Sequence, residues 1–468
     1  MRKFEFSKKT EIVILSIILL FALIIRVYSL GVPPFWVDES ISALTAKSII
    51  DNNFNLFNPD VFGVRALFFH YLQAFFLLFG QTEFLARFIS VLFGLLTIVL
   101  AWFIGREYSK YGGILAALFT AIFYLEVFYS RQSRMYQLFQ LLFFLSIYLL
   151  YKSKENPKYL YFALISLVLA VNTQIQGLIL TLFFIGHILM FNKKQKFWAI
   201  IPAFILIYNI VRIFGLPSDN VSQAVNYASQ YFSFASSIVY LLILAVPGIV
   251  WAFMKQKRLT VLLVVPSIIT LIGIFSLQTF AFRYSYFFFF IIVLYPSLFL
   301  SFSYEKFGSI LLIAILAMII IPSNLIYPAT YVNVLKPIDY NFDDFSAPEI
   351  NYKSIPQDLV DEIRNSDDKF IVYFSPHAEW YIKKPDYVVP FSLDGRGNDS
   401  ISVEIDGKVV DVYSKSPILE DVPEESYYFI VDLFSLSKLK PDQIEFMESL
   451  IEGCSIRYEN SDLRVFYC

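Results

Sequence analysis

Long apolar runs separated by short polar segments dominate the first two thirds of the chain. A helix needs about 20 apolar residues to cross the hydrocarbon core of a bilayer. Apolar runs of 14 to 21 residues occupy 12–30, 84–104, 112–129, 135–151, 159–172, 178–191, 197–214, 233–253, 260–277, 283–303 and 308–327. The pattern predicts an α-helical polytopic membrane protein with about eleven transmembrane helices.

One further apolar run, residues 66–79, is only 14 residues long and contains His70 and Gln73. A run this short and this polar is typical of a helix that lies in the membrane interface rather than one that crosses it. We therefore assign it to the first loop, residues 31–83, together with a second short helix at residues 40–50.

Basic residues mark one set of loops. If residues 66–79 do not cross, 16 Lys and Arg residues fall on the side of the N-terminus, in loops 1–11, 105–111, 152–158, 192–196, 254–259 and 304–307. The positive-inside rule makes this side cytoplasmic. A crossing at residues 66–79 would scatter the basic loops over both faces. We expect a multi-pass plasma-membrane protein with a cytoplasmic N-terminus and an outward-facing first loop.

The composition changes after residue 327. Residues 1–327 carry 24 Lys and Arg against 12 Asp and Glu, whereas residues 328–468 carry 13 against 27. Only 16% of the whole chain is charged, against about 25% in soluble proteins. This asymmetry predicts two domains in different solvents, a transmembrane module at 1–327 and a soluble extracytoplasmic domain at 328–468.

The C-terminal region alternates short apolar segments with turn residues. Asp406-Gly407 separates two of these segments and is typical of a hairpin turn. The pattern predicts a small α/β domain with helices at 356–365 and 441–451 and strands at 370–374, 386–391, 401–405, 408–413, 427–432, 455–458 and 463–467.

The two cysteines of the chain, Cys454 and Cys468, flank the last two predicted strands. An antiparallel pairing of these strands would bring the cysteines near each other, and an outer location permits a disulfide. A free C-terminal cysteine is the alternative.

The main candidate site residues are Asp38 and Glu39, which follow the first apolar run and the turn Pro33-Pro34-Phe35-Trp36. Acids favour the start of a helix, so capping of the helix at 40–50 is one interpretation. Capping needs only one acid, however. We favour a functional carboxylate pair.

Arginines form the second part of the candidate site. Arg65, Arg131, Arg134 and Arg283 fall at the predicted outer face, and a guanidinium group suits bidentate binding of phosphate. The alternative is that they reach lipid headgroups or pair with local acids. Glu126, near the outer end of the third span, is either functional or a buried partner of Arg131 or Arg134.

Histidine and metal chemistry have little support in the sequence. His70, His187 and His377 are scattered along the chain. No cofactor is required, and although a divalent metal is compatible with phosphate chemistry, no ligand cluster has a recognisable spacing. His377 is interpreted as a lone, non-functional loop histidine.

Four segments together resemble a known family. They are Phe35-Trp36-Val37-Asp38-Glu39-Ser40, Thr82-Glu83-Phe84-Leu85-Ala86-Arg87, Gly105-Arg106-Glu107 and Tyr129-Ser130-Arg131-Gln132-Ser133-Arg134-Met135-Tyr136. Their order and spacing resemble the glycosyltransferase C superfamily. The closest branch depends on polyprenyl-phosphate sugars and includes protein O-mannosyltransferases and the aminoarabinose transferases of lipid A. The resemblance covers about residues 10–300.

This resemblance implies an inverting transferase that moves a sugar from a polyprenyl monophosphate to a hydroxyl or amine of a protein, lipid or glycan at the outer face. It maps the family's catalytic acids onto Asp38 and Glu39. It adds the loop from Arg131 to Tyr136, and Arg283-Tyr284, to the site. The partners would be this donor, its acceptor and membrane lipids, with no nucleic acid.

The chain departs from the family pattern at two places. Where the family often has His-Pro-Pro, this chain has Gly63-Val64-Arg65, with His70 displaced by a turn. Asn172-Thr173-Gln174 stands where Thr-His-Tyr is common. These departures concern the acceptor and the sugar more than the reaction class, and they keep His70 among the candidates.

In the mechanism that this resemblance implies, Asp38 is the general base that takes the proton of the acceptor. Glu39 positions Asp38 or an acceptor group. Arg131 and Arg134, with Arg65 or Arg283, stabilise the charge of the departing phosphate.

A carrier or flippase of polyprenyl-linked sugars is the alternative function. Transport through the bilayer should place ionisable residues near the membrane midplane. In this sequence almost all such residues lie at the edges of the predicted spans, which favours the transferase.

Overall fold

The computed structural model describes residues 7–54, 66–214, 238–275, 282–308, 351–373, 375–389, 402–405, 408–411, 416–436, 439 and 441–468. The chain forms two compact units. We call the first, residues 1–30, 65–72 and 87–337, the helical unit, and the second, residues 31–64, 73–86 and 338–468, the mixed unit.

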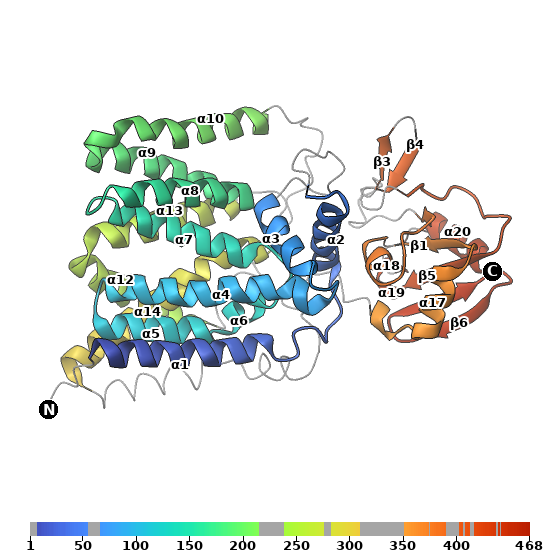
Figure 1. Ribbon diagram of the computed structural model, residues 1–468, viewed down its shortest axis with the longest axis horizontal. Coiled ribbons are helices and arrows are strands. Elements are labelled where there is room, and N and C mark those ends of the chain that lie inside the picture. The colour runs from blue at the N-terminus through green and yellow to red at the C-terminus, as the bar shows by residue number, and fades with distance from the viewer. Residues whose placement is uncertain are drawn as a thin grey trace. The chain divides into compact units, whose positions relative to one another are not determined.

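The helical unit is a bundle of apolar helices that run side by side (Figure 1). Ten of the eleven predicted spans coincide with helices, and the last, residues 308–327, lies outside the described residues. The elements are α1 (Lys8–Val27), α4 (Glu83–Arg106), α5 (Lys110–Ile122), α6 (Tyr124–Ser130), α7 (Tyr136–Lys152), α8 (Lys158–Thr173), η1 (Ile175–Leu178), α9 (Ile179–Phe191), η2 (Lys193–Ala199), α10 (Ile200–Phe214), α12 (Val239–Lys255), α13 (Lys257–Phe275), η3 (Phe282–Phe288) and α14 (Phe289–Phe307).

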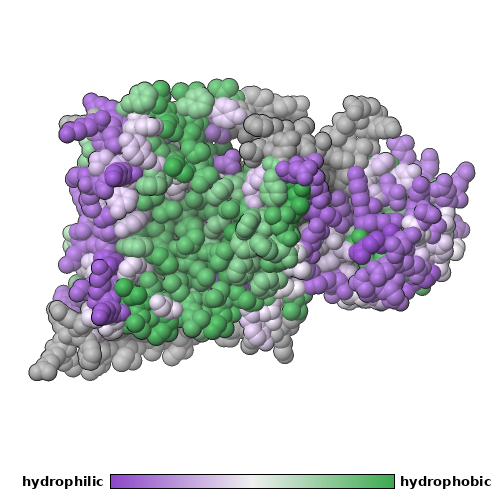
Figure 2. All heavy atoms as spheres, viewed as in Figure 1, coloured by the Kyte–Doolittle hydropathy of each residue, from purple (hydrophilic) through white to green (hydrophobic). Residues whose placement is uncertain are grey.

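The surface of this bundle is a broad apolar belt (Figure 2), to which α1, α8, α10 and α12 contribute exposed Ile, Val, Leu and Phe side chains. Such a surface is unfavourable in water and stable against lipid. Four described helices are long and apolar enough to cross a membrane, Lys8–Val27, Glu83–Arg106, Lys257–Ile274 and Arg283–Phe307, or five if α5 and α6 form one span. The structure is thus that of a multi-helix membrane protein.

The third predicted span, residues 112–129, is not one straight helix. Its two parts, α5 and α6, meet at an angle of 61°. Phe123 between them is extended, with φ −63° and ψ 125°. Such a break frees carbonyl groups at the end of α5, and inside a bilayer they need a partner other than water. The Arg26 guanidinium supplies it, donating to Ala121 O at 2.9 Å and Thr120 O at 3.3 Å.

The basic loops gather at one end of the bundle. Glu11 pairs with Arg106 at 3.2 Å, and Glu107 pairs with Lys152 at 3.2 Å. Further contacts join the remaining loops, between Tyr151 and Gln256, between Ser153 and Asn192, and between the rings of Tyr111 and Tyr304. The loops predicted to share the cytoplasmic side therefore do share one end of the helical unit.

Two short helices are the predicted elements of the first loop. One is α2 (Val37–Asp51), and the other, α3 (Leu67–Leu77), is an 11-residue helix. At 1.5 Å per residue α3 is roughly 16 Å long, too short to cross the hydrocarbon core. The start of α2 at Val37, before the predicted start at residue 40, places Asp38 and Glu39 inside the helix.

The C-terminal part of the mixed unit is built on a five-stranded sheet of order β2-β1-β5-β7-β6. β1 pairs in parallel with β2 and β5, whereas β7 is antiparallel to β5 and β6. The elements are η5 (Tyr352–Ser354), α17 (Gln357–Asn365), β1 (Lys369–Val372), α18 (Ser375–Tyr381), β2 (Tyr387–Val388), β3 (Ser402–Ile405), β4 (Lys408–Asp411), β5 (Tyr427–Asp432), α19 (Leu433–Leu436), α20 (Pro441–Ile451), β6 (Ser455–Glu459) and β7 (Leu463–Tyr467). β3 and β4 form the predicted hairpin.

Both faces of this sheet are covered. All six residues of β5 are buried, as expected for a central strand with packing on each side. One core contains residues of α17 and α18, and the other contains residues of α20. Ile41 of α2 packs against the second core, so the first loop and the C-terminal region share one apolar interior within the mixed unit.

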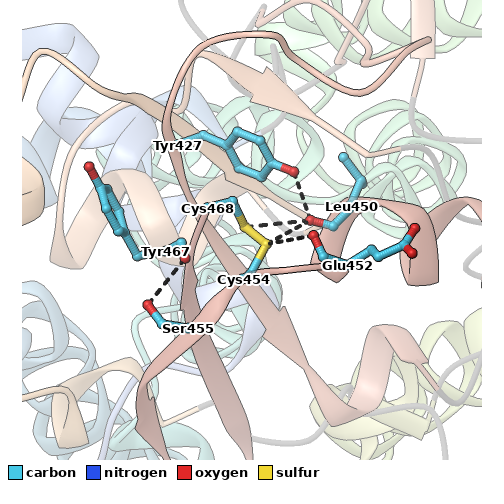
Figure 3. The surroundings of a disulfide bond; sticks show 7 residues. All are labelled: Tyr427, Leu450, Glu452, Cys454, Ser455, Tyr467 and Cys468. Atoms are coloured by element: carbon cyan, nitrogen blue, oxygen red, sulfur yellow. Dashed lines mark hydrogen bonds between the residues drawn. A yellow bond between two sulfur atoms is a disulfide. The ribbon is translucent and has the colours of Figure 1, made fainter.

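Cys454 and Cys468 form a disulfide that joins the ends of the last two strands (Figure 3), with a Cα–Cα distance of 4.3 Å. Beside it, the Tyr427 hydroxyl donates a hydrogen bond to Leu450 O at 2.7 Å. The antiparallel pairing of β6 and β7 brings the two cysteines together, which decides between the two alternatives that the sequence leaves open.

Candidate functional site

Asp38 and Glu39 occupy the first turn of α2. The N-cap residue is Trp36, which makes no side-chain capping bond, and the backbone N–H of Glu39 donates to Trp36 O at 2.9 Å. Neither acid is therefore the N-cap residue. Glu39 is 2% exposed and Asp38 is half-buried.

Glu126 lies in α6 of the helical unit and is 1% exposed. Gln140 Nε2 donates to Glu126 Oε1 at 2.7 Å, and the Tyr286 hydroxyl donates to Glu126 Oε2 at 2.6 Å. The Arg26 guanidinium is close enough to act on Glu126 electrostatically. The predicted pairing of Glu126 with Arg131 or Arg134 is thus replaced by bonds to neutral groups of α7 and η3, together with the charge of Arg26.

This network extends further along α7. The Tyr286 hydroxyl also lies 2.6 Å from Gln137 Oε1, and Gln137 Nε2 donates to Thr97 Oγ1 at 3.0 Å and to Gln140 Oε1 at 3.1 Å. Buried polar groups in a membrane need such partners, because unsatisfied ones are costly. The sequence patterns do not single out Gln137, Gln140 or Tyr286. Two glutamines at i, i+3 on an apolar helix were the available signal, because they fall on one face.

Arg131 is hydrogen-bonded to the backbone at the end of α1. Its Nη1 lies within hydrogen-bonding distance of three carbonyl oxygens, Arg26 O at 2.8 Å, Tyr28 O at 2.8 Å and Ile25 O at 3.1 Å. A cation in this place complements the negative end of the helix and its unpaired carbonyls. These bonds give Arg131 a structural role that its sequence motif does not reveal.

Arg134 and Tyr136 lie together beside the Glu126 network. The Arg134 guanidinium stands 5.5 Å from the centroid of the Tyr136 ring, and its Nη2 is 3.4 Å from the Tyr136 hydroxyl. Tyr136 is buried and contacts Tyr129 edge-on, and Tyr129 in turn lies 4.2 Å from Tyr286 between ring centroids. The second predicted outer loop and the late Arg-Tyr segment are therefore neighbours within the helical unit.

Of the remaining candidates, Arg283, Tyr284 and His70 lie within the described residues. Arg283 lies 5.6 Å from the ring centroid of Tyr284, and both side chains are half-buried. His70 is buried on α3, and Arg65 lies outside the described residues. Among the described side chains, no group of three or more His, Cys, Asp or Glu could hold a metal ion.

Residues 64–216 match the family model of dolichyl-phosphate-mannose-protein mannosyltransferase. No curated protein matches this sequence. The matched segment contains α3 to α10, and with them Glu126, Arg131, Arg134 and Tyr136.

Solved structures share the fold at low sequence identity. ArnT from Cupriavidus metallidurans in the apo state has a TM-score of 0.61 at 9% identity, and ArnT bound to undecaprenyl phosphate has 0.56 at 11%, each with 98% of both chains covered. The oligosaccharyltransferase AglB from Archaeoglobus fulgidus, in complex with an inhibitory peptide and a dolichol-phosphate, has a TM-score of 0.52 at 13% identity over 79% of this chain. This chain covers 63% of AglB.

The family match and the shared fold support the same resemblance. The match contains three of the four motif segments and begins after Phe35–Ser40, and the ArnT structures cover 98% of the chain. Together they confirm the resemblance of this chain to the polyprenyl-phosphate-sugar-dependent glycosyltransferases of the glycosyltransferase C superfamily.

Proposed function

We propose that this protein is an inverting membrane glycosyltransferase that moves a sugar from a polyprenyl monophosphate to an acceptor hydroxyl or amine on the outer face of the membrane. The family match supports the reaction class. The donor class is supported by two proteins of the same fold, one bound to undecaprenyl phosphate and the other in complex with a dolichol-phosphate.

The observation that carries the proposal is the placement of the acid pair in α2. Two adjacent carboxylates share the first turn of one helix, yet Glu39 is buried and Asp38 is half-exposed. An accessible ionised carboxylate can receive a proton from an acceptor, whereas a buried one cannot reach it. We therefore assign Asp38 as the general base and Glu39 as the residue that orients it.

The departing phosphate needs positive charge. Of the arginines proposed from the sequence, Arg134 and Arg283 are half-buried, and each lies over a tyrosine ring. A guanidinium held by a ring keeps its planar donors oriented for phosphate oxygens. We assign phosphate binding to these two arginines, with Tyr136 and Tyr284 holding them in place. Arg131 contributes indirectly through the end of α1, and Arg65 and His70 stay secondary candidates.

The disulfide supports an outer location of residues 328–468. Disulfides persist in oxidising compartments and are rare in the cytosol, and Cys454–Cys468 is closed. With the basic loops gathered at one end of the helical unit, the positive-inside rule favours a cytoplasmic N-terminus.

The test is incubation of the purified protein with a panel of polyprenyl-phosphate sugars and acceptors. We expect release of polyprenyl phosphate, and a transferred sugar with the opposite anomeric configuration from the donor. A carrier would release none, so an absence of release across the panel would contradict the proposal and favour transport.

The assignment of Asp38 is tested with Asp38→Asn. Loss of a general base lowers rates by about 10²–10⁴-fold, so we expect turnover to fall by at least about a hundredfold while the protein stays inserted and monodisperse. Asp51→Asn, at the exposed end of the same helix, is the matched control and should keep wild-type turnover. Full activity of Asp38→Asn would remove the assigned role.

A further inference from the structure

Residues of the C-terminal region hold the backbone that leads into α2. Within the mixed unit, the N–H of Phe35 donates to the Tyr381 hydroxyl at 2.8 Å. The C=O of Phe35 accepts from His377 Nε2 at 2.9 Å. Both backbone groups of one residue are thus bound by side chains of a single short helix, α18, more than 340 positions away in sequence.

The Phe35 side chain is fixed in the same place. It is fully buried, and its ring centroid lies 5.2 Å from that of Trp380. Tyr352 stacks on His377 at 5.8 Å and on Tyr381 at 6.4 Å. The bond from His377 is buried and the bond to Tyr381 is partly buried, and hydrogen bonds away from water are stronger and more costly to break.

The chemistry of His377 suits this contact. A carbonyl oxygen can only accept, so Nε2 carries the proton in this bond. Burial lowers the pKa of His377 to about 4. The ring is therefore neutral at neutral pH, and it donates its single N–H to Phe35.

The acid pair is fixed on both sides along the chain. Before it, Lys353 Nζ donates to Gly31 O at 2.8 Å and pairs with Glu83 at 2.9 Å. After it, Ile41 packs into the core of the sheet. Phe35 and Ile41 bracket Asp38 at three residues on each side, so a shift of either one would move the first turn of α2.

We propose that His377 and Tyr381 are positioning residues for the acid pair. They fix the backbone of Phe35 and thereby the orientation of the first turn of α2, from which the side chains of Asp38 and Glu39 project. This inference rests on the proposed function of the pair. It assigns to the C-terminal region a part in the reaction, and it replaces the interpretation of His377 as a non-functional loop histidine.

The test compares four variants in the full-length protein. Tyr381→Phe removes the hydroxyl that accepts from Phe35 and keeps the ring, and His377→Leu removes the N–H donor. His377→Gln keeps an amide N–H at nearly the same reach. The matched control is Tyr427→Phe, which deletes a buried tyrosine hydroxyl in the same unit that is bonded to Leu450 O and not to the backbone of residues 31–41.

Two readouts are measured on each variant. The first is hydrogen exchange of the backbone amides of residues 35–41 without substrate. The second is kcat and KM for a polyprenyl-phosphate sugar. For Tyr381→Phe and His377→Leu we expect faster exchange at residues 35–41. We also expect kcat to fall about tenfold with little change in KM, because a small misplacement of reacting groups slows turnover. His377→Gln should restore most of the slow exchange and most of the kcat, and Tyr427→Phe should behave as wild type.

Unchanged exchange at residues 35–41 in Tyr381→Phe and His377→Leu would overturn the inference. Faster exchange without any loss of kcat, or an equal loss of kcat in Tyr427→Phe, would also overturn it. Exchange needs no turnover, so the anchoring of α2 is judged even if the wild-type protein releases no polyprenyl phosphate. That last result would contradict only the proposed function.

Discussion

At the scale of single residues, two buried titratable groups of the mixed unit respond to pH in opposite directions. Asp432 is fully buried at the start of α19, where it accepts from the N–H and hydroxyl of Ser435 at 2.7 and 2.8 Å. Burial raises the pKa of Asp432 to about 6 and lowers the pKa of His377 to about 4. Their unfolded values are 3.8 and 6.5.

The two shifts have opposite effects on the free energy of unfolding. His377 has a lowered folded pKa, so its contribution is complete above pH 6.5 and is lost as the pH falls towards 4. Asp432 has a raised folded pKa, so its contribution is complete below pH 3.8 and is lost as the pH rises through 6. Each shift corresponds to about 3 kcal/mol, so they largely cancel in the wild-type protein.

We expect variants to separate the two effects. In His377→Gln the free energy of unfolding of the mixed unit should fall by about 3 kcal/mol as the pH rises from 4 to 6. In Asp432→Asn it should rise by about as much between pH 4 and 6.5. Hydrogen exchange of β1 and β5 peptides, corrected for intrinsic rates at each pH, measures both slopes. Parallel pH profiles for both variants and the wild type would contradict this account.

At the scale of elements, the bend between α5 and α6 depends on close packing. Arg26 from α1 bonds the freed carbonyls of α5, and α4 crosses beside it at Gly94. A Cβ at Gly94 would lie 2.7 Å from Ser130 Cβ and 3.2 Å from Arg26 Nε. Glycine thus lets α4, α6 and Arg26 meet at one point, next to the network of Glu126.

We expect Gly94→Ala to destabilise the helical unit by about 1–3 kcal/mol, the usual cost of overpacking. Gly273→Ala is the matched control, because α13 has open space around that position, and alanine there should be neutral or slightly stabilising. The thermal unfolding midpoints of the two purified variants in one detergent are compared with that of the wild type. Equal midpoints would show that the packing at Gly94 can relax.

Some element boundaries were predictable and others were not. Apolar runs located the helices of the bundle, because a backbone in lipid must satisfy its own hydrogen bonds over a fixed length. The sequence predicts a helix from residue 40, directly after the two acids. In the structure Phe35 is held from α18, and the helix begins at Val37. A contact so distant in sequence leaves no local signal.

At the scale of the whole molecule, charge and the disulfide favour one orientation in the membrane. The basic loops share one end of the helical unit, and the C-terminal disulfide favours an oxidising compartment. Both cysteines are in that disulfide and no thiol is free. A thiol reagent therefore reacts only with an introduced cysteine, and its reaction shows on which side of the membrane that residue lies.

We expect a membrane-impermeant maleimide to label Glu424→Cys on intact cells, because Glu424 is exposed in the predicted outer domain. Lys194→Cys, in a basic loop and also exposed, should be labelled only after the membrane is permeabilised. The unsubstituted protein is the blank. The opposite pattern would invert the proposed topology and place the acid pair in the cytosol. Labelling of both variants on intact cells would contradict the prediction that an odd number of spans separates the two positions.

The sequence by itself determined the apolar helices of the bundle, most strands of the C-terminal sheet, which loops are basic, and which acids and arginines are candidates, because run length, periodicity and charge are local properties. It did not predict α18, and it placed His377, which lies on that helix, in a loop. Tertiary structure decided the bend at Phe123, the bonds of Arg131 to the end of α1, and the bonding of Glu126 to Tyr286, 160 residues away. It also joined Phe35 to His377 across 342 residues. Such pairs depend on which helix faces pack together, and many packings satisfy the same hydrophobic pattern, so only the folded chain selects among them.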